Sequence, residues 1–231
     1  MGATYGQFCP IAKAMELLDE RWTMLIVREL LYHPMHFNEL RRGMPRMSPS
    51  LLSKRLTQLE RAGLVDRHAT GNEVEYRLSA AGAELRPVLE GLAAWGVRWM
   101  GQAGQRELDP KLMMRQLALF VDPTRTPDRR NAIEFQFTDM PAKLCNWWLV
   151  VDPDGADVCD FNPGHEVTLT VRAPLVALVD WWLGNRGWSE LTGSGTVELT
   201  GPSVVRRGFP HWFELPAFAT VPRADVPLTV G

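Results

Sequence analysis

Apolar residues recur at helical spacing in the first part of the chain. From Pro10, a residue suited to the first position of a helix, Ile11, Met15 and Leu18 follow one another at intervals of four and three. The next segment, 22–32, is apolar on most sides. A helix of that kind is expected at the centre of a domain.

Two further helices are predicted after the His33-Pro34 break. The segment 37–43 indicates a short helix that stops at Gly43, and 44–49 indicates a turn. Ser48 is a good N-cap for a helix that then runs to about Gly63, a residue typical of a helix end. The order is helix, tight turn, helix.

The helix that follows Ser48 has two distinct faces. A pitch of 3.6 residues turns successive side chains by about 100°, which separates hydroxyl and cationic residues from leucines. Short hydroxyls let a helix enter the major groove, and cations reach phosphates or guanine edges. An ordinary amphipathic surface helix would share the leucine stripe. The first face holds Ser50, Ser53, Lys54, Thr57 and Arg61, and the second holds Leu52, Leu56 and Leu59.

An alternating pattern after this helix predicts a β-hairpin. Val74, Tyr76 and Leu78 face one way, and the tip is Thr70-Gly71-Asn72. The hairpin stands where a wing would follow a helix-turn-helix. Basic residues on it favour phosphate contact, whereas acidic residues oppose it; these are Arg67 and His68 against Glu73 and Glu75.

The chain changes character after Gly104. A helix over 108–121 and a polar linker over 123–130 are predicted to connect two domains, 1–104 and 131–231, with 105–130 between them. The second domain has strands with one helix between the fourth and fifth and another at the end, so the expected fold class is α+β. The strands are expected at 133–139, 143–151, 156–161, 166–172 and 195–201, and the helices at 174–187 and 202–213.

Composition places the chain among folded proteins of two-domain size. Of 231 residues, 45% are hydrophobic and 23% charged, and no run is apolar enough for a membrane span. Three cysteines without metal-binding spacing favour a reducing compartment, so a cytoplasmic protein is expected. The net charge of −2 hides a basic stretch, 41–67, which carries Arg41, Arg42, Arg46, Lys54, Arg55, Arg61 and Arg67 against Glu60 and Asp66. Such a patch favours binding to a phosphate backbone.

The first hundred residues resemble the HxlR family of bacterial winged helix-turn-helix regulators, a relative of the MarR type. The resemblance rests on CPIAKAMELLDERWTMLIVREL, FNELRRGMPRMSPSLLSKRLTQLERAGLV, YRLSAAGAEL and PVLEGLAAWGVRW. It implies a homodimer whose recognition helices enter successive major grooves of double-stranded operator DNA. The expected DNA-binding residues are Arg41, Arg42, Arg46, Ser48, Ser50, Ser53, Lys54, Arg55, Thr57, Gln58, Arg61, Arg67 and His68.

A regular apolar stripe follows the hairpin and supports dimerisation independently. Its residues recur at intervals of three and four, which suits pairing with another helix, although the stripe could instead pack on its own domain. They are Leu85, Val88, Leu92, Trp95 and Trp99.

Cys9 stands at the predicted N-cap of the first helix, where the helix dipole favours a thiolate, and Lys13 lies one turn on. The family resemblance implies that such a cysteine serves some members as a sensor of oxidants or electrophiles. An inert, half-buried thiol is the alternative.

The order of elements in the second domain is similar to the sterol-carrier-protein fold. That resemblance implies a sheet with helices on one face around an apolar tunnel, and hence a hydrophobic small-molecule effector. The many tryptophans fit a pocket lining, a close-packed core or a subunit contact. The candidate ligand-binding residues are Phe135, Trp147, Leu149, Leu178, Trp181 and Trp182.

No catalytic constellation is visible, so no enzyme, metal or cofactor is expected. His165 and His211 stand alone, and the glycines at 193, 195 and 201 are not placed as in a phosphate loop. The expected function is a homodimeric DNA-binding regulator, possible as repressor or activator. Its rival is a lipid or small-molecule carrier, or an enzyme, with a helical dimerisation module.

Overall fold

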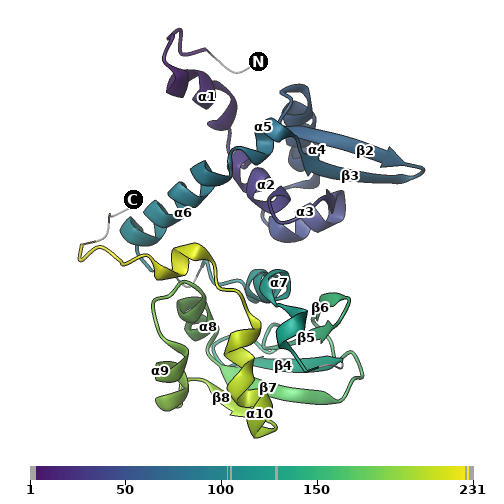
Figure 1. The fold of residues 1–231 in the computed structure, drawn as a ribbon, viewed down its shortest axis with the longest axis vertical. Coiled ribbons are helices and arrows are strands. Elements are labelled where there is room, and N and C mark those ends of the chain that lie inside the picture. The colour runs from purple at the N-terminus through teal and green to yellow at the C-terminus, as the bar shows by residue number, and fades with distance from the viewer. Residues whose placement is uncertain (1–3, 103, 105, 128–129, 227, 229–231) are drawn as a thin grey trace. The chain divides into compact units, whose positions relative to one another are not determined.

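The structure is a computed structural model that describes residues 4–102, 104, 106–127, 130–226 and 228. The chain divides into two compact units, the first ending at Leu92 and the second beginning at Ala93. The helices and strands of each unit are labelled in Figure 1.

The first unit contains the four predicted helices and the predicted hairpin. Trp22, the N-cap of the second helix, has a positive φ of 79°, which breaks the helical path between the first two helices. The elements are α1 (Pro10–Leu18), α2 (Thr23–Leu30), β1 (Met35–His36), α3 (Phe37–Gly43), α4 (Pro49–Arg61), β2 (Val65–Thr70), β3 (Glu73–Leu78), α5 (Ala80–Ala83) and the start of α6 (Arg86–Trp99).

The core of the first unit joins α2, α3 and α4 to a three-stranded sheet of order β1-β3-β2. Gly43 lets α3 approach α2 closely, since a Cβ at this position would overlap the buried carboxylate of Glu29. Tyr76 and Leu78 of β3 pack against the same core. This packing fixes the wing and the helix pair as one body.

The second unit is an α+β fold whose five strands were all predicted. The sheet order is β6-β5-β4-β7-β8, in which β4 and β7 are parallel and the other pairs antiparallel. The helix α9 was not predicted. The elements are α7 (Pro110–Phe120), η1 (Pro123–Arg125), β4 (Asn131–Phe137), β5 (Asn146–Asp152), β6 (Gly155–Cys159), β7 (Val167–Ala173), α8 (Leu175–Trp182), α9 (Trp188–Gly193), β8 (Glu198–Thr200), α10 (Ser203–Gly208), η2 (Phe209–Trp212) and η3 (Ala217–Thr220).

The helix α7 belongs to the core of the second unit. Met113, Met114 and Leu117 are buried in one cluster with side chains of β4, β5 and β7. The sequence had placed this segment outside both domains, in a connection over 105–130. The difference has a physical reason, because the apolar stripe of α7 finds its burial on the sheet and not on a partner.

The five-stranded sheet has one face toward the helices and one face away from them. Trp147 joins the helix-side core, while its neighbour Trp148 lies on the opposite face, as alternation along a strand requires. The face away from the helices also carries Glu134, Val150 and Asp152, which are partly exposed. This face therefore combines the buried ring of Trp148 with partly exposed polar and apolar side chains.

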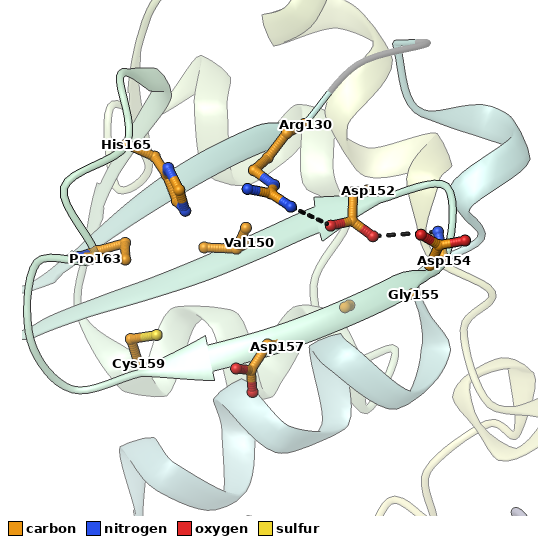
Figure 2. A pocket seen from close by; sticks show the side chains of 10 residues that line it. Arg130, Val150, Asp152, Asp154, Gly155, Asp157, Cys159, Pro163 and His165 are labelled. Atoms are coloured by element: carbon orange, nitrogen blue, oxygen red, sulfur yellow. Dashed lines mark hydrogen bonds and ion pairs between the residues drawn. The ribbon is translucent and has the colours of Figure 1, made fainter.

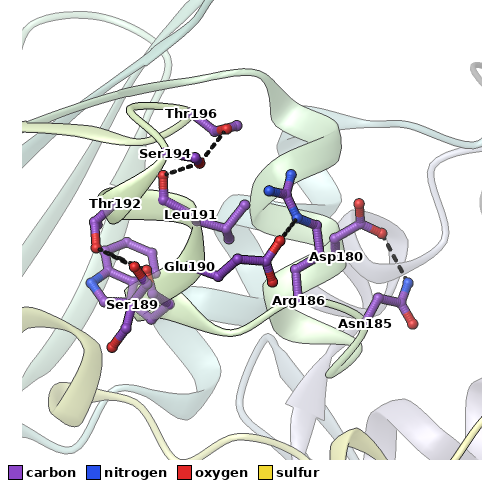
Figure 3. A network of polar contacts seen from close by, with 10 residues as sticks. Asp180, Asn185, Arg186, Ser189, Glu190, Leu191, Thr192, Ser194 and Thr196 are labelled. Carbon is purple, nitrogen blue, oxygen red and sulfur yellow. Dashed lines mark hydrogen bonds and ion pairs between the residues drawn. The ribbon is translucent and has the colours of Figure 1, made fainter.

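A polar network closes the turn between α8 and α9 (Figure 3). Asn185 donates from Nδ2 to Asp180 at 2.8 Å, and Arg186 pairs with Glu190 at 2.7 Å. The Oδ1 of Asn185 in turn accepts a hydrogen bond from Arg223 Nε at 2.8 Å, and Arg223 Nη1 also donates to the carbonyl of Val97 in α6. The network thus holds the C-terminal segment against the end of α6.

Candidate nucleic-acid interface

The helix α4 begins and ends as its sequence predicts. The Ser48 hydroxyl accepts a hydrogen bond from the Leu51 amide at 3.3 Å, Pro49 occupies the first turn, and Gly63 takes a positive φ of 76° after the helix. Its leucines are anchored in the core of the first unit: Leu52, Leu56 and Leu59. The opposite face of α4 must therefore point outward.

The outward face carries hydroxyls and cations, and α3 adds two arginines beside it. Thr57 Oγ1 donates to the Ser53 carbonyl at 3.1 Å, so this hydroxyl is held close to the helix and leaves the surface shallow. All the predicted DNA-binding residues except Arg55 are exposed: Arg41, Arg42, Arg46, Ser48, Ser50, Ser53, Lys54, Thr57, Gln58, Arg61, Arg67 and His68.

Arg55 corrects the expectation that its side chain is exposed. It is 8% exposed, and its Nη2 donates to Glu20 Oε2 at 2.9 Å while Nη1 donates to Gln58 Oε1 at 2.8 Å. The guanidinium therefore connects α4 to the turn between α1 and α2. It is not placed to contact DNA.

The wing carries a mixed set of charges. Arg77 Nη2 lies 3.2 Å from His68 Nδ1, and His68 is paired in register with Glu75 of β3. Of its two predicted DNA contacts, His68 thus lies beside Arg77 and opposite Glu75, whereas Arg67 is paired in register with Tyr76. We expect the wing to contribute less than α4 to binding.

His36 is a residue that sequence reasoning missed. It precedes α3, where its amide donates to Glu39 Oε2 at 2.7 Å, and its Nδ1 lies 2.9 Å from the Val74 carbonyl of β3. That backbone hydrogen bond, together with Glu39, Glu73 and Glu75, raises the pKa of His36 above its ordinary value. Histidine is a rare N-cap, but the Glu three residues later was a signal that could have identified it.

The apolar stripe of α6 is largely exposed. Leu92 is 52% and Trp95 47% exposed, and Val88 and Trp99 share the exposure. Leu85, which precedes α6, instead packs against the core of the first unit. The structure therefore offers four of the predicted dimerisation residues to a partner and uses the fifth internally.

Cys9 lies at the N-cap of α1 as predicted, and its free thiol is half-buried. The chain before it folds back onto the helix, because Thr4 donates to Glu16 at 2.7 Å and Tyr5 donates to Asp19 at 2.6 Å. Lys13 is paired with Glu16 at 3.3 Å. The cation expected to assist the thiol is thus shared with a carboxylate.

The six candidate ligand-binding residues lie in the packed core of the second unit. Aromatic rings there contact one another, with Trp181 and Trp188 centroids 4.8 Å apart and Trp181 and Phe213 centroids 5.7 Å apart. These contacts are what the core alternative predicts. Neither the cavity at Arg130 and His165 nor the one at Arg98 and Arg223 includes any of the six, which are Phe135, Trp147, Leu149, Leu178, Trp181 and Trp182.

Two other features are absent from the part of the chain that the structure describes. No group of three or more His, Cys, Asp or Glu side chains is arranged to hold a metal ion. Within the same residues, no helix combines the length and apolar character that crossing a membrane requires.

Comparison with known proteins places the first unit in a family. The model of the HxlR-like helix-turn-helix family matches residues 17–104. The HTH-type transcriptional regulator YvaP of Bacillus subtilis is 36% identical over 99 residues, which cover 41% of this chain and 92% of YvaP. The regulator sll1512 of Synechocystis is 36% identical over 100 residues, which cover 42% of this chain and 74% of sll1512.

A third relative is the transcriptional regulator YodB of Bacillus subtilis, 34% identical over 91 residues that cover 38% of this chain and 81% of YodB. Its reduced form has been solved, and that structure matches 39% of this chain and 92% of its own with a TM-score of 0.36. The similarity of the second unit to the sterol-carrier-protein fold stays a prediction. By its identity to YvaP over nearly all of that protein, and by the match of residues 17–104, the chain belongs to the HxlR-like helix-turn-helix family of transcriptional regulators.

Proposed function

We propose that the protein is a homodimeric regulator that inserts α4 into the major groove of operator DNA. One observation carries the proposal: the face of α4 opposite its buried leucines is exposed and made of hydroxyls and cations. A groove that admits a helix requires such small side chains near the bases, and Lys54 and Arg61 can reach phosphates or base edges. Arg41 and Arg42 at the end of α3 add phosphate contacts beside it.

Fluorescence anisotropy with DNA from the protein's own upstream region tests this proposal. Lys54→Glu should weaken binding at least about tenfold and flatten the dependence of log K on log salt by about 0.9 per lost phosphate contact. Lys111→Glu makes the same change on α7 and should leave binding unaltered. Absence of salt-sensitive, sequence-preferring binding would instead favour the carrier or enzyme alternative.

The dimer is proposed from the exposed stripe on α6. Val88, Leu92, Trp95 and Trp99 would bury their apolar surface against the same stripe of a second copy, as an isologous interface requires. Two recognition helices held at a fixed spacing would then match the two halves of an inverted repeat. The spacing of the half-sites should therefore correspond to about one helical turn of DNA.

Redox or electrophile sensing through Cys9 is a second candidate function. The observation that favours it is a free, half-buried thiol at the N-cap of α1, which follows the segment that Thr4 and Tyr5 fasten to that helix. YodB has also been solved in diamide-treated and quinone-bound forms. The Cys9 sulfur would add to a quinone ring carbon by forming one S–C bond, while the thiol proton passes to one quinone oxygen and the proton on the attacked ring carbon passes to the other, which gives a hydroquinone thioether. The bulky adduct would separate the N-terminal segment from α1.

Intact-mass measurement after quinone treatment, paired with anisotropy, tests the sensor. Cys9→Ser should abolish both the adduct and any change in DNA affinity. Cys145→Ser and Cys159→Ser are matched controls that should retain both. An adduct on Cys9 without a change in affinity would reject the sensing role and leave DNA binding untouched.

The second unit is proposed to bind a small-molecule effector. The earlier expectation of an apolar guest stays a prediction, and the close packing around Trp181 does not favour it. An effector can shift DNA affinity only by as much as it distinguishes two arrangements of the dimer.

A further inference from the structure

A cavity of about 380 Å³ lies on the face of the sheet away from the helices (Figure 2). Val150 of β5, Cys159 of β6 and Pro163 form its apolar floor. Its walls are polar or charged: Arg130 and His165 belong to the segments before β4 and β7, while Asp157 lies on β6. The cavity therefore combines a small apolar surface with groups of both signs.

The charges are separated across the sheet. The strand order β6-β5-β4-β7 puts Asp157 on one side of β5 and the side chains of Arg130 and His165 on the other, and Figure 2 shows Arg130 and His165 extending toward Val150 from the side opposite Asp157. Asp152, which pairs with Arg130, and Asp154, in the turn between β5 and β6, add two carboxylates beside Arg130 (Figure 2). The site therefore has Arg130, its paired carboxylate and His165 on one side of β5 and the Asp157 carboxylate on the other.

Arg130 retains donors for a ligand. Its Nη2 pairs with Asp152 at 3.2 Å, but both side chains are solvent-accessible and such a pair contributes about 0–1 kcal/mol. Asp152 is also occupied by the Asp154 amide, which donates to it at 3.1 Å. A ligand carboxylate could thus bind the rest of the guanidinium fork without breaking a strong contact.

The span of the site fits a particular molecular size. From β6 to β4 there are two strand spacings of about 4.8 Å, so the opposite charges lie roughly 10 Å apart at the backbone. The ammonium and carboxylate of an α-amino acid, each with a hydrogen bond of about 2.8 Å to the protein, span roughly 8–9 Å. The side chains of the protein cover the remaining distance between the backbone and the two ends of the ligand.

Other ligand classes fit less well. A simple anion would face Asp154 and Asp157, and a simple cation would face Arg130. An apolar molecule would take charged groups out of water without pairing them, which is unfavourable. We propose that this cavity binds an amino-acid zwitterion, with its carboxylate at Arg130 and His165, its ammonium at Asp157, and a small apolar side chain over Val150 and Cys159. The inference rests on the effector-binding role proposed for the second unit.

Isothermal titration calorimetry on the full chain, with each standard L-amino acid as the probe, tests the inference without DNA. At least one amino acid with an apolar side chain should bind. Its deaminated acid and its decarboxylated amine should each bind at least about tenfold more weakly. No binding by any amino acid, or equal binding by an analogue that lacks one charge, overturns the inference.

Variants locate the two ends of the ligand. Asp157→Asn should weaken binding of the amino acid at least about tenfold but leave binding of the deaminated acid unchanged. His165→Gln should weaken binding of the amino acid but leave binding of the decarboxylated amine unchanged. Asp160→Asn removes a nearby exposed carboxylate outside the cavity and should change neither. Loss of affinity in Asp160→Asn equal to that in Asp157→Asn would reject the site. Because no DNA is present, failure here leaves the proposed operator binding standing.

Discussion

Glu20 and Arg55 join two elements of the first unit that are 35 residues apart in sequence. Arg55 Nη2 donates to Glu20 Oε2 at 2.9 Å, with the arginine almost fully buried and the glutamate half exposed. Because Glu20 lies in the turn after α1, the pair ties the recognition helix to the element that begins at Cys9. We therefore expect Arg55 to position the proposed DNA-binding surface.

Removing the ion pair between Glu20 and Arg55 should lower the stability of the folded protein. We expect Arg55→Gln to destabilise the fold by about 1–3 kcal/mol, since it removes the buried guanidinium that bonds Glu20 and Gln58, whereas Lys54→Gln should stay within about 0.5 kcal/mol. Urea denaturation followed by tryptophan fluorescence measures both.

The salt dependence of binding separates positioning from contact. Both Glu20→Gln and Arg55→Gln should weaken DNA binding with an unchanged slope of log K against log salt. If Arg55→Gln lowers the slope by about 0.9, as the loss of a phosphate contact would, then Arg55 reaches DNA and the positioning role is wrong. The exchanged pair Glu20→Arg with Arg55→Glu should recover part of the lost stability.

The burial of Arg55 was contained in the helix geometry but obscured by the residue type. Arg55 follows Leu52 by three positions and precedes Leu59 by four, so it shares the face of the buried leucines. A basic residue within a basic stretch nevertheless favoured the opposite interpretation. Its partner Glu20 belongs to another element, and local periodicity carries no information about that contact.

In the second unit, too, local sequence patterns do not reveal which elements contact one another. Alternation predicted the five strands, because each buries one face, yet the sequence could not give their order or the parallel pairing of β4 with β7. The cavity at Arg130, Asp157 and His165 depends on that order. Apolar clusters such as the one around Trp181 are visible in a sequence, but whether they enclose space depends on packing.

The exposed stripe on α6 predicts a dimer that one substitution should dissociate. Leu92→Asp places a charge at a surface that would be buried between copies, so the dimer dissociation constant should rise by at least about 100-fold and operator affinity should fall with it. Sedimentation equilibrium measures the association. Glu90→Ala changes a residue on the side of α6 opposite Leu92 and should keep the dimer. A Leu92→Asp protein that remains dimeric would assign the interface elsewhere.

His36 should make the attachment of the wing depend on pH. Its folded pKa is raised above 6.5 by the hydrogen bond to the Val74 carbonyl, with further contributions from Glu39, Glu73 and Glu75. A raised pKa means that protonation stabilises the folded state fully below the unfolded value, and that this contribution disappears as pH rises through the folded pKa. NMR titration should find His36 titrating above about 6.5. In His36→Gln, the stability difference from wild type should shrink from about pH 6 to pH 8; a difference that grows over this range would contradict the sign.

Arg223 should determine how firmly the end of α6 is held. Its Nη1 donates to the carbonyls of Val97 and Met100, the latter at 3.4 Å, and its Nε is oriented by Asn185. The last carbonyls of a helix have no partners within the helix, so an arginine that binds them acts as a cap from a distant segment. Arg223→Ala should therefore destabilise the second unit by about 1–2 kcal/mol, while Arg207→Ala on exposed α10 should stay within about 0.5 kcal/mol.

Arg223→Lys provides the sharper comparison. A lysine has one nitrogen and cannot serve both Asn185 and two carbonyls from the geometry of a guanidinium fork, so it should recover little of the lost stability. Hydrogen exchange should then rise at Ala224 and Leu228, whose amides donate to the Arg98 and Trp99 carbonyls at 2.8 Å. Full recovery by lysine, with exchange at these amides as slow as in the wild type, would show that charge alone holds the segment and that the fork is not required.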